Sequence, residues 1–101
     1  YGGGIKNIDQ VKKLLAIGYE KVVINTEFVN NPQLVKEAVA LAGSQSVVIS
    51  IDAKKKNDKY VCAINDGKKI IDESPVGLAK KAEELGAGEI FVNSIDQDGM
   101  I

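Results

Sequence analysis

The sequence contains no histidine and only one cysteine, Cys62. A zinc site built on these residues and a Cys-His nucleophile pair are therefore excluded, and no disulfide can form within the chain. A lone thiol is typical of a reducing compartment, so we expect a cytoplasmic protein. No apolar run reaches the roughly 18 residues of a membrane span, and no signal-peptide pattern is present, so we expect no membrane role.

The sequence also lacks an excess of either charge, because it has 13 basic and 14 acidic residues. No basic block is interleaved with aromatic residues, which argues against a nucleic-acid partner. The short lysine run at residues 54–56 is expected to be a solvated loop. At 101 residues the chain has under half the length of a (β/α)8 barrel, which needs about 250 residues. It also lacks an initiator Met, so we expect a single domain, residues 1–101, cut from a longer protein.

Helical and strand patterns alternate along the chain. Helices are predicted at residues 8–17, 32–43 and 74–85, each with a capping residue or proline at its start and a glycine at or just after its end. Strands are predicted at residues 21–26, 47–51 and 89–95. Each strand is apolar at consecutive positions, as strands buried on both faces are. The alternation predicts an α/β fold of parallel strands joined by right-handed crossovers.

Residues 54–69 break this alternation. Residues 59–64 have strand character, Asp66-Gly67 is a strong turn pair, and residues 68–71 provide a partner strand. We interpret the segment 59–71 as a hairpin inserted into a loop between a strand and the next helix.

An internal repeat supports the alternation. Gly18 aligns with Gly86 and Asn25 with Asn93, in each case 68 positions apart. Strands two apart in a (β/α)8 barrel contribute to the same interior layer, so equivalent strand ends should face the mouth together. The alternative is that any two βα units look alike.

Functional groups in parallel α/β sheets gather at the carboxyl ends of the strands. Asp52 directly follows one predicted strand, where partial desolvation would raise its pKa toward a value useful for general acid or base catalysis. Alternatively it caps a turn or pairs with Lys54. The glycines at 2–4 allow close approach of an anion, or only make a tight turn, and Thr26 offers a hydroxyl to phosphate.

Two other charged groups have weaker signals. Asp96 and Asp98 precede Gly99 in an ordinary turn sequence and supply too few ligands for a metal, so substrate hydrogen bonding is the better interpretation. No metal site and no cofactor are predicted. The charges at the strand beginnings, on Glu20, Lys21 and Glu89, are surface charge on physical grounds alone.

Several ordered blocks match one family over nearly the whole chain. They include Tyr1-Gly-Gly-Gly-Ile5, Glu20-Lys-Val-Val-Ile-Asn-Thr26, Ser50-Ile-Asp-Ala-Lys54 and Asn93-Ser-Ile-Asp-Gln-Asp-Gly99. In these blocks the chain resembles the cyclase subunit of imidazole glycerol phosphate synthase, the HisF-like family. The resemblance implies the central part of a phosphate-binding TIM barrel, from its third to its sixth strand.

The resemblance also implies chemistry. The family cyclises a phosphoribulosyl formimino aminoimidazole carboxamide ribotide with ammonia, which a glutaminase subunit docked on the lower face supplies. Asp52 matches the second of two catalytic aspartates, and the first belongs to a strand that this chain lacks. Lys21 and Glu89 match an ammonia gate, and Glu20 faces the glutaminase. The predicted residues for substrate and phosphate binding are Gly3, Gly4, Asn25, Thr26, Asn93, Asp98 and Gly99.

Some positions depart from that pattern. Tyr1, Asn93, Met100 and the residues 74–76 resemble a paralogue of surface-polysaccharide gene clusters, which delivers ammonia for sugar amidation. A further alternative is a non-catalytic half-barrel. We expect the isolated segment to be inactive, because the first-strand acid is missing. We also expect it to self-associate, or else to be the ordered part of a longer chain, because an open barrel leaves two sheet edges with unpaired backbone groups.

Overall fold

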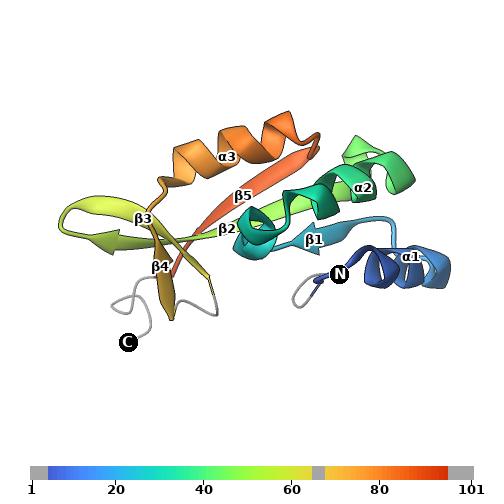
Figure 1. The fold of residues 1–101 in the computed structure, drawn as a ribbon, viewed down its shortest axis with the longest axis horizontal. Coiled ribbons are helices and arrows are strands. Elements are labelled where there is room, and N and C mark those ends of the chain that lie inside the picture. The colour runs from blue at the N-terminus through green and yellow to red at the C-terminus, as the bar shows by residue number, and fades with distance from the viewer. Residues whose placement is uncertain (1–4, 65–67, 96–101) are drawn as a thin grey trace.

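The computed structural model describes residues 5–64 and 68–95. Figure 1 shows helices packed along a twisted sheet that extends at one end into an antiparallel ribbon. In chain order the elements are α1 (Ile8–Ile17), β1 (Val22–Ile24), η1 (Thr26–Asn30), α2 (Pro32–Ala42), η2 (Ser44–Ser46), β2 (Val47–Lys56), β3 (Lys59–Ile64), β4 (Lys69–Ile71), α3 (Pro75–Glu84) and β5 (Glu89–Ser94).

Strand β2 is the centre of the sheet. It pairs in parallel with β1, where Val22 is opposite Val47, and with β5, where Val48 is opposite Glu89. Two βαβ crossovers, through α2 and through α3, therefore link three adjacent parallel strands, as predicted. The strand expected to precede α1 would end in residues 1–4, which lie outside the described part of the chain.

The helix boundaries follow the predicted capping signals. Asn7 begins α1 with a capping box in which its side chain accepts from the backbone of Gln10, and Ser74 caps α3 in the same way at Gly77. Gly18 and Gly86, the repeat pair, have φ values of 116° and 104° just after α1 and α3. These left-handed conformations favour glycine, so the repeat reflects two equivalent helix-to-strand turns.

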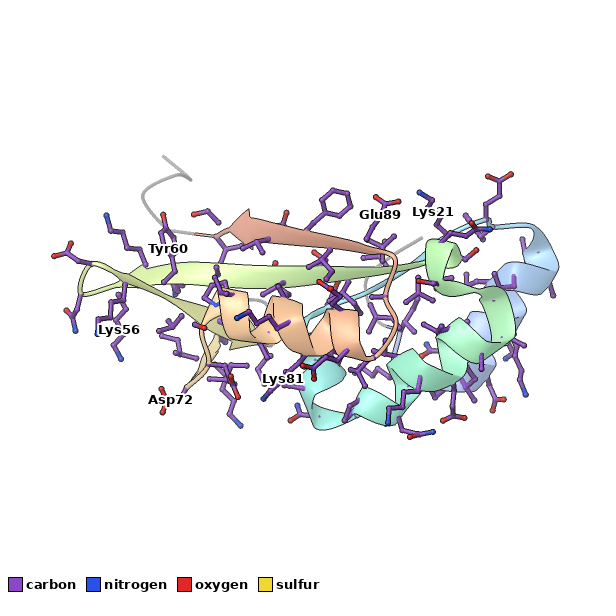
Figure 2. The ribbon with its side chains drawn as sticks, turned by 90° about the horizontal axis from the view of Figure 1, so that it is seen from above. Lys21, Lys56, Tyr60, Asp72, Lys81 and Glu89 are labelled. Carbon is purple, nitrogen blue, oxygen red and sulfur yellow. The ribbon has the colours of Figure 1, made fainter. Side chains whose placement is uncertain are left out.

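The hydrophobic core lies between the helices and one face of the sheet. Ile49 and Ile51 of β2 pack in one cluster with residues of the helices such as Val35 and Leu78. Figure 2 shows α2 and α3 on the same side of the sheet. Side chains alternate between the two faces of a strand, so the positions between these core residues project from the opposite face. We call that face the open face and define it by Val48, Ser50, Asp52, Phe91 and Asn93.

The structure corrects the boundaries of two strands. Strand β1 is shorter than predicted, because the 3-10 helix η1 begins at Thr26. Strand β2 is longer, since it continues through Asp52 and the lysine run to Lys56, which we expected to be a loop.

The reason for the longer strand is a tight turn between β2 and β3. Asn57 and Asp58 both have positive φ, 51° and 65°, the conformation of a two-residue hairpin turn that Asn and Asp tolerate well. Strand β3 then pairs antiparallel with β2, as Lys56 opposite Lys59 shows. The predicted pairing of β3 with β4 is confirmed, with Cys62 opposite Ile71. The predicted hairpin is thus the outer part of a three-stranded ribbon that grows directly out of β2.

Gly88 is fixed by close contact between two backbone segments. A Cβ at this position would lie 2.3 Å from the carbonyl oxygen of Ser44 and 3.0 Å from Cα of Gln45. The Gly88 N–H also donates to the carbonyl of Val47 at 3.0 Å, so the segment cannot move away without losing that bond.

We therefore predict that Gly88→Ala lowers the free energy of unfolding by about 1–3 kcal/mol, because backbone has to shift to admit the methyl group. Thermal unfolding followed by circular dichroism measures the change. Gly77→Ala is the matched control: its Cβ meets only side-chain atoms, Ser74 Oγ at 3.1 Å and Glu73 Oε2 at 3.5 Å, and alanine favours the helical conformation. Equal melting temperatures for the two variants would contradict this account of Gly88.

Candidate functional site

Polar side chains gather at the end of the sheet where the parallel strands finish. β1, β2 and β5 run in the same direction, so their carboxyl ends lie together. Asp52 is opposite Asn93 in the β2–β5 register, and both lie on the open face. Asn25 and Thr26 directly follow β1 on the other side of β2. This brings together four of the residues predicted from the sequence.

A hydrogen bond joins the ends of β1 and β2. The backbone N–H of Asp52 donates to Oγ1 of Thr26 at 2.8 Å. Thr26 is only 1% exposed, whereas Asp52 is partly buried. The Thr26 hydroxyl therefore belongs to the packed edge of β2, and the Asp52 side chain stands on the open face beside it.

A second hydrogen bond joins β2 to β5 on the open face. Nδ2 of Asn93 donates to Oγ of Ser50 at 2.6 Å. Because Ser50 precedes Asp52 by two positions, both point from the same face. The result is a polar group of Ser50, Asp52 and Asn93, in which an amide and a hydroxyl flank a carboxylate.

The opposite end of the sheet carries an ion pair. Nζ of Lys21 donates to Oε1 of Glu89, and the two side chains are 55% and 40% exposed. Figure 2 shows both on the side of the sheet away from α3. They line a pocket of about 570 Å³. Its other lining residues are Glu20, Gln45, Ser46 and Gly88.

Two apolar side chains, Val48 and Phe91, also lie on the open face. Val48 is opposite Glu89 in the register and Phe91 is opposite Ser50, so each lies beside a charged or polar side chain. Val48 is 3% exposed and Phe91 is 53% exposed. Along β5 the open face therefore carries a charged, an apolar and a polar residue, Glu89, Phe91 and Asn93, and along β2 it carries Val48, Ser50 and Asp52.

The structure adds three residues to those predicted at the charged end. Gln45, Ser46 and Gly88 line the pocket beside Glu20, Lys21 and Glu89. They directly precede β2 and β5, as Glu20 and Lys21 precede β1. Their position just before a predicted strand could therefore have identified them from the sequence. The contact between Thr26 and Asp52 had no such signal, because it depends on where β1 ends.

Other predicted residues lie outside the described part of the chain. These are Gly3, Gly4, Asp98 and Gly99, together with the Asp96 carboxylate. In the described ranges, no group of three or more Cys, Asp or Glu side chains is arranged to hold a metal ion. Nor do residues 5–64 and 68–95 contain a helix long and apolar enough to cross a membrane.

The whole chain, residues 1–101, matches the model of a family described as histidine biosynthesis protein. The chain belongs to this family. Its fold is a (β/α)8 TIM barrel, and the parallel strands β1, β2 and β5 with their covering helices are part of such a barrel. The α/β class and the partial barrel predicted from the sequence are confirmed, and the predicted hairpin is present as the outer part of the antiparallel ribbon.

Curated relatives are similar over nearly the entire chain. A putative imidazole glycerol phosphate synthase subunit HisF of Leptospira interrogans is 43% identical over 103 residues, which is 100% of this chain and 41% of the relative. Proteins named imidazole glycerol phosphate synthase subunit HisF are 43% identical in Thermococcus onnurineus and 46% identical in a Hydrogenobaculum species, each covering 97% of this chain and 39% of the relative. The chain therefore spans about two fifths of their length.

Cys62 lies close to this region but is chemically separate from it. It is fully buried on β3, and burial, with a smaller contribution from the negative charge of Glu73, raises the pKa of its thiol from 9.0 to about 11. Folding therefore favours the neutral thiol, and the native protein becomes easier to unfold as the pH rises from about 9 toward about 11.

We predict that Cys62 reacts with iodoacetamide at pH 8 at least 100-fold more slowly in the native protein than after unfolding in guanidinium chloride. The factor follows from the thiolate fraction, which falls roughly tenfold for each unit by which the pKa rises. Mass spectrometry of timed samples measures both rates. Native labelling at the unfolded rate would show that the thiol is neither buried nor shifted.

Proposed function

We propose that this protein is the cyclase subunit of imidazole glycerol phosphate synthase. In that role it uses ammonia to close an imidazole ring from a phosphoribulosyl formimino aminoimidazole carboxamide ribotide. The aminoimidazole carboxamide ribotide is released as the second product. The support is the similarity to HisF-named relatives over 97–100% of this chain, together with a strand-end carboxylate flanked by hydrogen-bonding groups. The relatives' names favour ring closure over the alternative of sugar amidation.

Asp52 is the proposed general acid or base of this segment. It stands on the open face beside Asn93 and Ser50, at the end of the sheet where barrel enzymes bind their substrates. A carboxylate at this position can take a proton from an attacking amine or return it to a leaving nitrogen. The other catalytic carboxylate that the resemblance implies belongs to the first strand of the barrel, which is not part of residues 1–101. On this basis the segment alone is proposed to be inactive.

The substrate's phosphates are proposed to bind on both sides of this carboxylate. The first proposed phosphate group consists of Asn25 and Thr26, which follow β1, together with Gly3 and Gly4. The second consists of Asn93, which lies in β5, together with Asp98 and Gly99. Phosphate binding by such strand-end loops uses backbone N–H groups and uncharged polar side chains. No cofactor is needed for this reaction scheme.

The charged end of the sheet is the proposed site of ammonia entry and of the glutaminase subunit. Lys21 and Glu89 form an ion pair there, and the pocket around them includes Glu20. An exposed pair of this kind contributes about 0–1 kcal/mol to stability, so it can open without unfolding the sheet. The apolar side chains of Val48, beside Glu89, and Phe91, the next open-face residue of β5, would favour neutral ammonia over ammonium. We also propose a cytoplasmic location, where a phosphorylated metabolite is available.

We predict that Asp52→Asn in the intact protein reduces turnover with the ribotide and ammonium salt by about 100- to 10,000-fold, as expected when a general acid or base is lost. Phosphate affinity should change little, because the amide has nearly the same shape. Steady-state kinetics and product-analogue titration measure the two effects. Asp58→Asn is the matched control, since Asp58 occupies the exposed turn of the ribbon with a φ of 65° that Asn also tolerates. Unchanged turnover in Asp52→Asn would overturn the assignment.

If residues 1–101 form one unit of a partial barrel, as proposed, the isolated chain has exposed sheet edges. In the described part of the chain, β1 and β5 each pair only with β2 and so form the two edges of the parallel sheet. Phe91 and Val92 of β5 are 53% and 52% exposed, whereas Val22 and Ile24 of β1 are covered by the helices. Leaving a large apolar side chain in water costs about 1.5–3 kcal/mol, so the β5 edge favours association.

We predict that residues 1–101 produced alone associate into dimers or larger species. Multi-angle light scattering with a dilution series measures the mass, and Phe91→Lys, which places a charge on the exposed strand, should shift the equilibrium toward monomer. Lys80→Glu on α3 is a control for a charge change away from the strand edge. A monodisperse species at 10.8 kDa, with a melting temperature independent of concentration, would contradict the prediction.

A further inference from the structure

Thr26 has an unusual environment for a residue assigned to a ligand site. Of the residues that the structure describes, it is the one polar side chain in the buried class, at 1% exposed. Its Oγ1 accepts the hydrogen bond from the Asp52 N–H at 2.8 Å. A buried hydroxyl that already accepts a hydrogen bond from a neighbouring strand has its position fixed by that strand. Little of its surface is accessible to a ligand.

The bond lies where β2 changes its partner. The paired residues of β1 and β2 end at Ile24 opposite Ile49, and the antiparallel pairing of β2 with β3 begins at Asp52 opposite Ala63. Strand β5 pairs with β2 across residues 48–53, so β1 and β3 must share the other edge. Between them this edge of β2 has no strand opposite it, and η1, which begins at Thr26, lies there against β3.

We propose that the Thr26 hydroxyl is a positioning group for Asp52. It accepts a hydrogen bond from the Asp52 N–H at the point where the pairing of β2 with β3 begins, and so holds the peptide unit that carries the proposed catalytic carboxylate. Without the hydroxyl, a partly buried N–H would be left without this acceptor, and β2 would relax at the residue whose side chain must meet the substrate. The inference rests on the proposed function for its kinetic consequence, but not for the bond itself.

The proposal separates two roles at one residue. If the hydroxyl held a phosphate, its removal would weaken substrate binding and raise KM. If it holds Asp52, its removal misplaces the carboxylate and lowers kcat, while any phosphate contact made by the Thr26 backbone persists. A valine has the same branched shape as threonine without the hydroxyl, and a serine keeps the hydroxyl without the methyl group, so the two substitutions distinguish shape from hydrogen bonding.

The kinetic test uses the intact protein with the ribotide and ammonium salt. Thr26→Val is expected to lower kcat by about 10- to 100-fold, as a small misplacement of a reacting group does, with KM within about threefold of the wild type. Thr26→Ser is expected to recover most of the lost turnover. A rise in KM alone, equal losses in both variants, or wild-type turnover in Thr26→Val would each overturn the proposal.

A second measurement does not depend on any activity. Hydrogen exchange of the Asp52 amide, followed by nuclear magnetic resonance in the same intact protein, reports on the bond directly. Exchange should be faster in Thr26→Val by about two- to tenfold, as expected for the loss of one hydrogen bond, and close to wild type in Thr26→Ser. If Thr26→Val fails to fold, Thr26→Ala, which removes the hydroxyl without added bulk, serves in both experiments.

The two measurements distinguish the failure of this inference from that of the proposed function. In one case, Asp52 exchange is slow and depends on the hydroxyl, but Asp52→Asn leaves turnover unchanged. The hydrogen bond would then be supported without a catalytic purpose, and the positioning role would be rejected. Unchanged exchange in the variant lacking the hydroxyl would reject it even if Asp52 proved essential.

Discussion

The double pairing of β2 is the constraint on which the rest of the structure depends. This one strand is parallel to β1 and β5 along its first half and antiparallel to β3 along its second. The parallel half requires helical crossovers, which cover one face and create the core around Ile49 and Ile51. The antiparallel half needs only a two-residue turn, so it projects from the sheet as a ribbon (Figure 1). Asp52 lies where the two halves meet.

The two faces of the sheet carry different kinds of residue because side chains alternate along the strands. On the covered face, apolar residues pack against α2 and α3 and stabilise the fold. On the open face, β5 carries Glu89, Phe91 and Asn93, and β2 carries Val48, Ser50 and Asp52 opposite them. A charge at Phe91 stays hydrated because that position is 53% exposed, whereas one at Val48, which is 3% exposed, would have to be desolvated. Substitutions on the covered face should therefore act on stability, and under the proposed function those on the open face act on ammonia passage and catalysis.

Local signals in the sequence predicted most of this arrangement. Asn7, Pro32 and Ser74 begin helices, and Gly18 and Gly86 follow helix ends, because caps and left-handed turns depend on a few neighbouring residues. The lysine run of β2 was predicted wrongly for the opposite reason. Three charged residues before Asn57 have the composition of a loop, and only pairing with β3 makes them a strand, which is tertiary context. Asp52 was predicted to follow a strand but lies within β2, near the end of its parallel pairing with β5, and its bond to Thr26 depends on β1 stopping at Ile24.

The junction at Asp52 also links the ribbon to the chemistry. The same backbone that carries the carboxylate pairs with Ala63 of β3 on one edge, and on the other edge the carbonyl of Ala53 accepts from the N–H of Ile95. The Thr26 hydroxyl adds a further hydrogen bond to the backbone of β2 at Asp52. Hydrogen bonds on both edges of one strand are stiffer than either alone, because displacement toward one partner stretches the bond to the other. An inserted ribbon that might have loosened the strand end instead helps to fix the residue at its base.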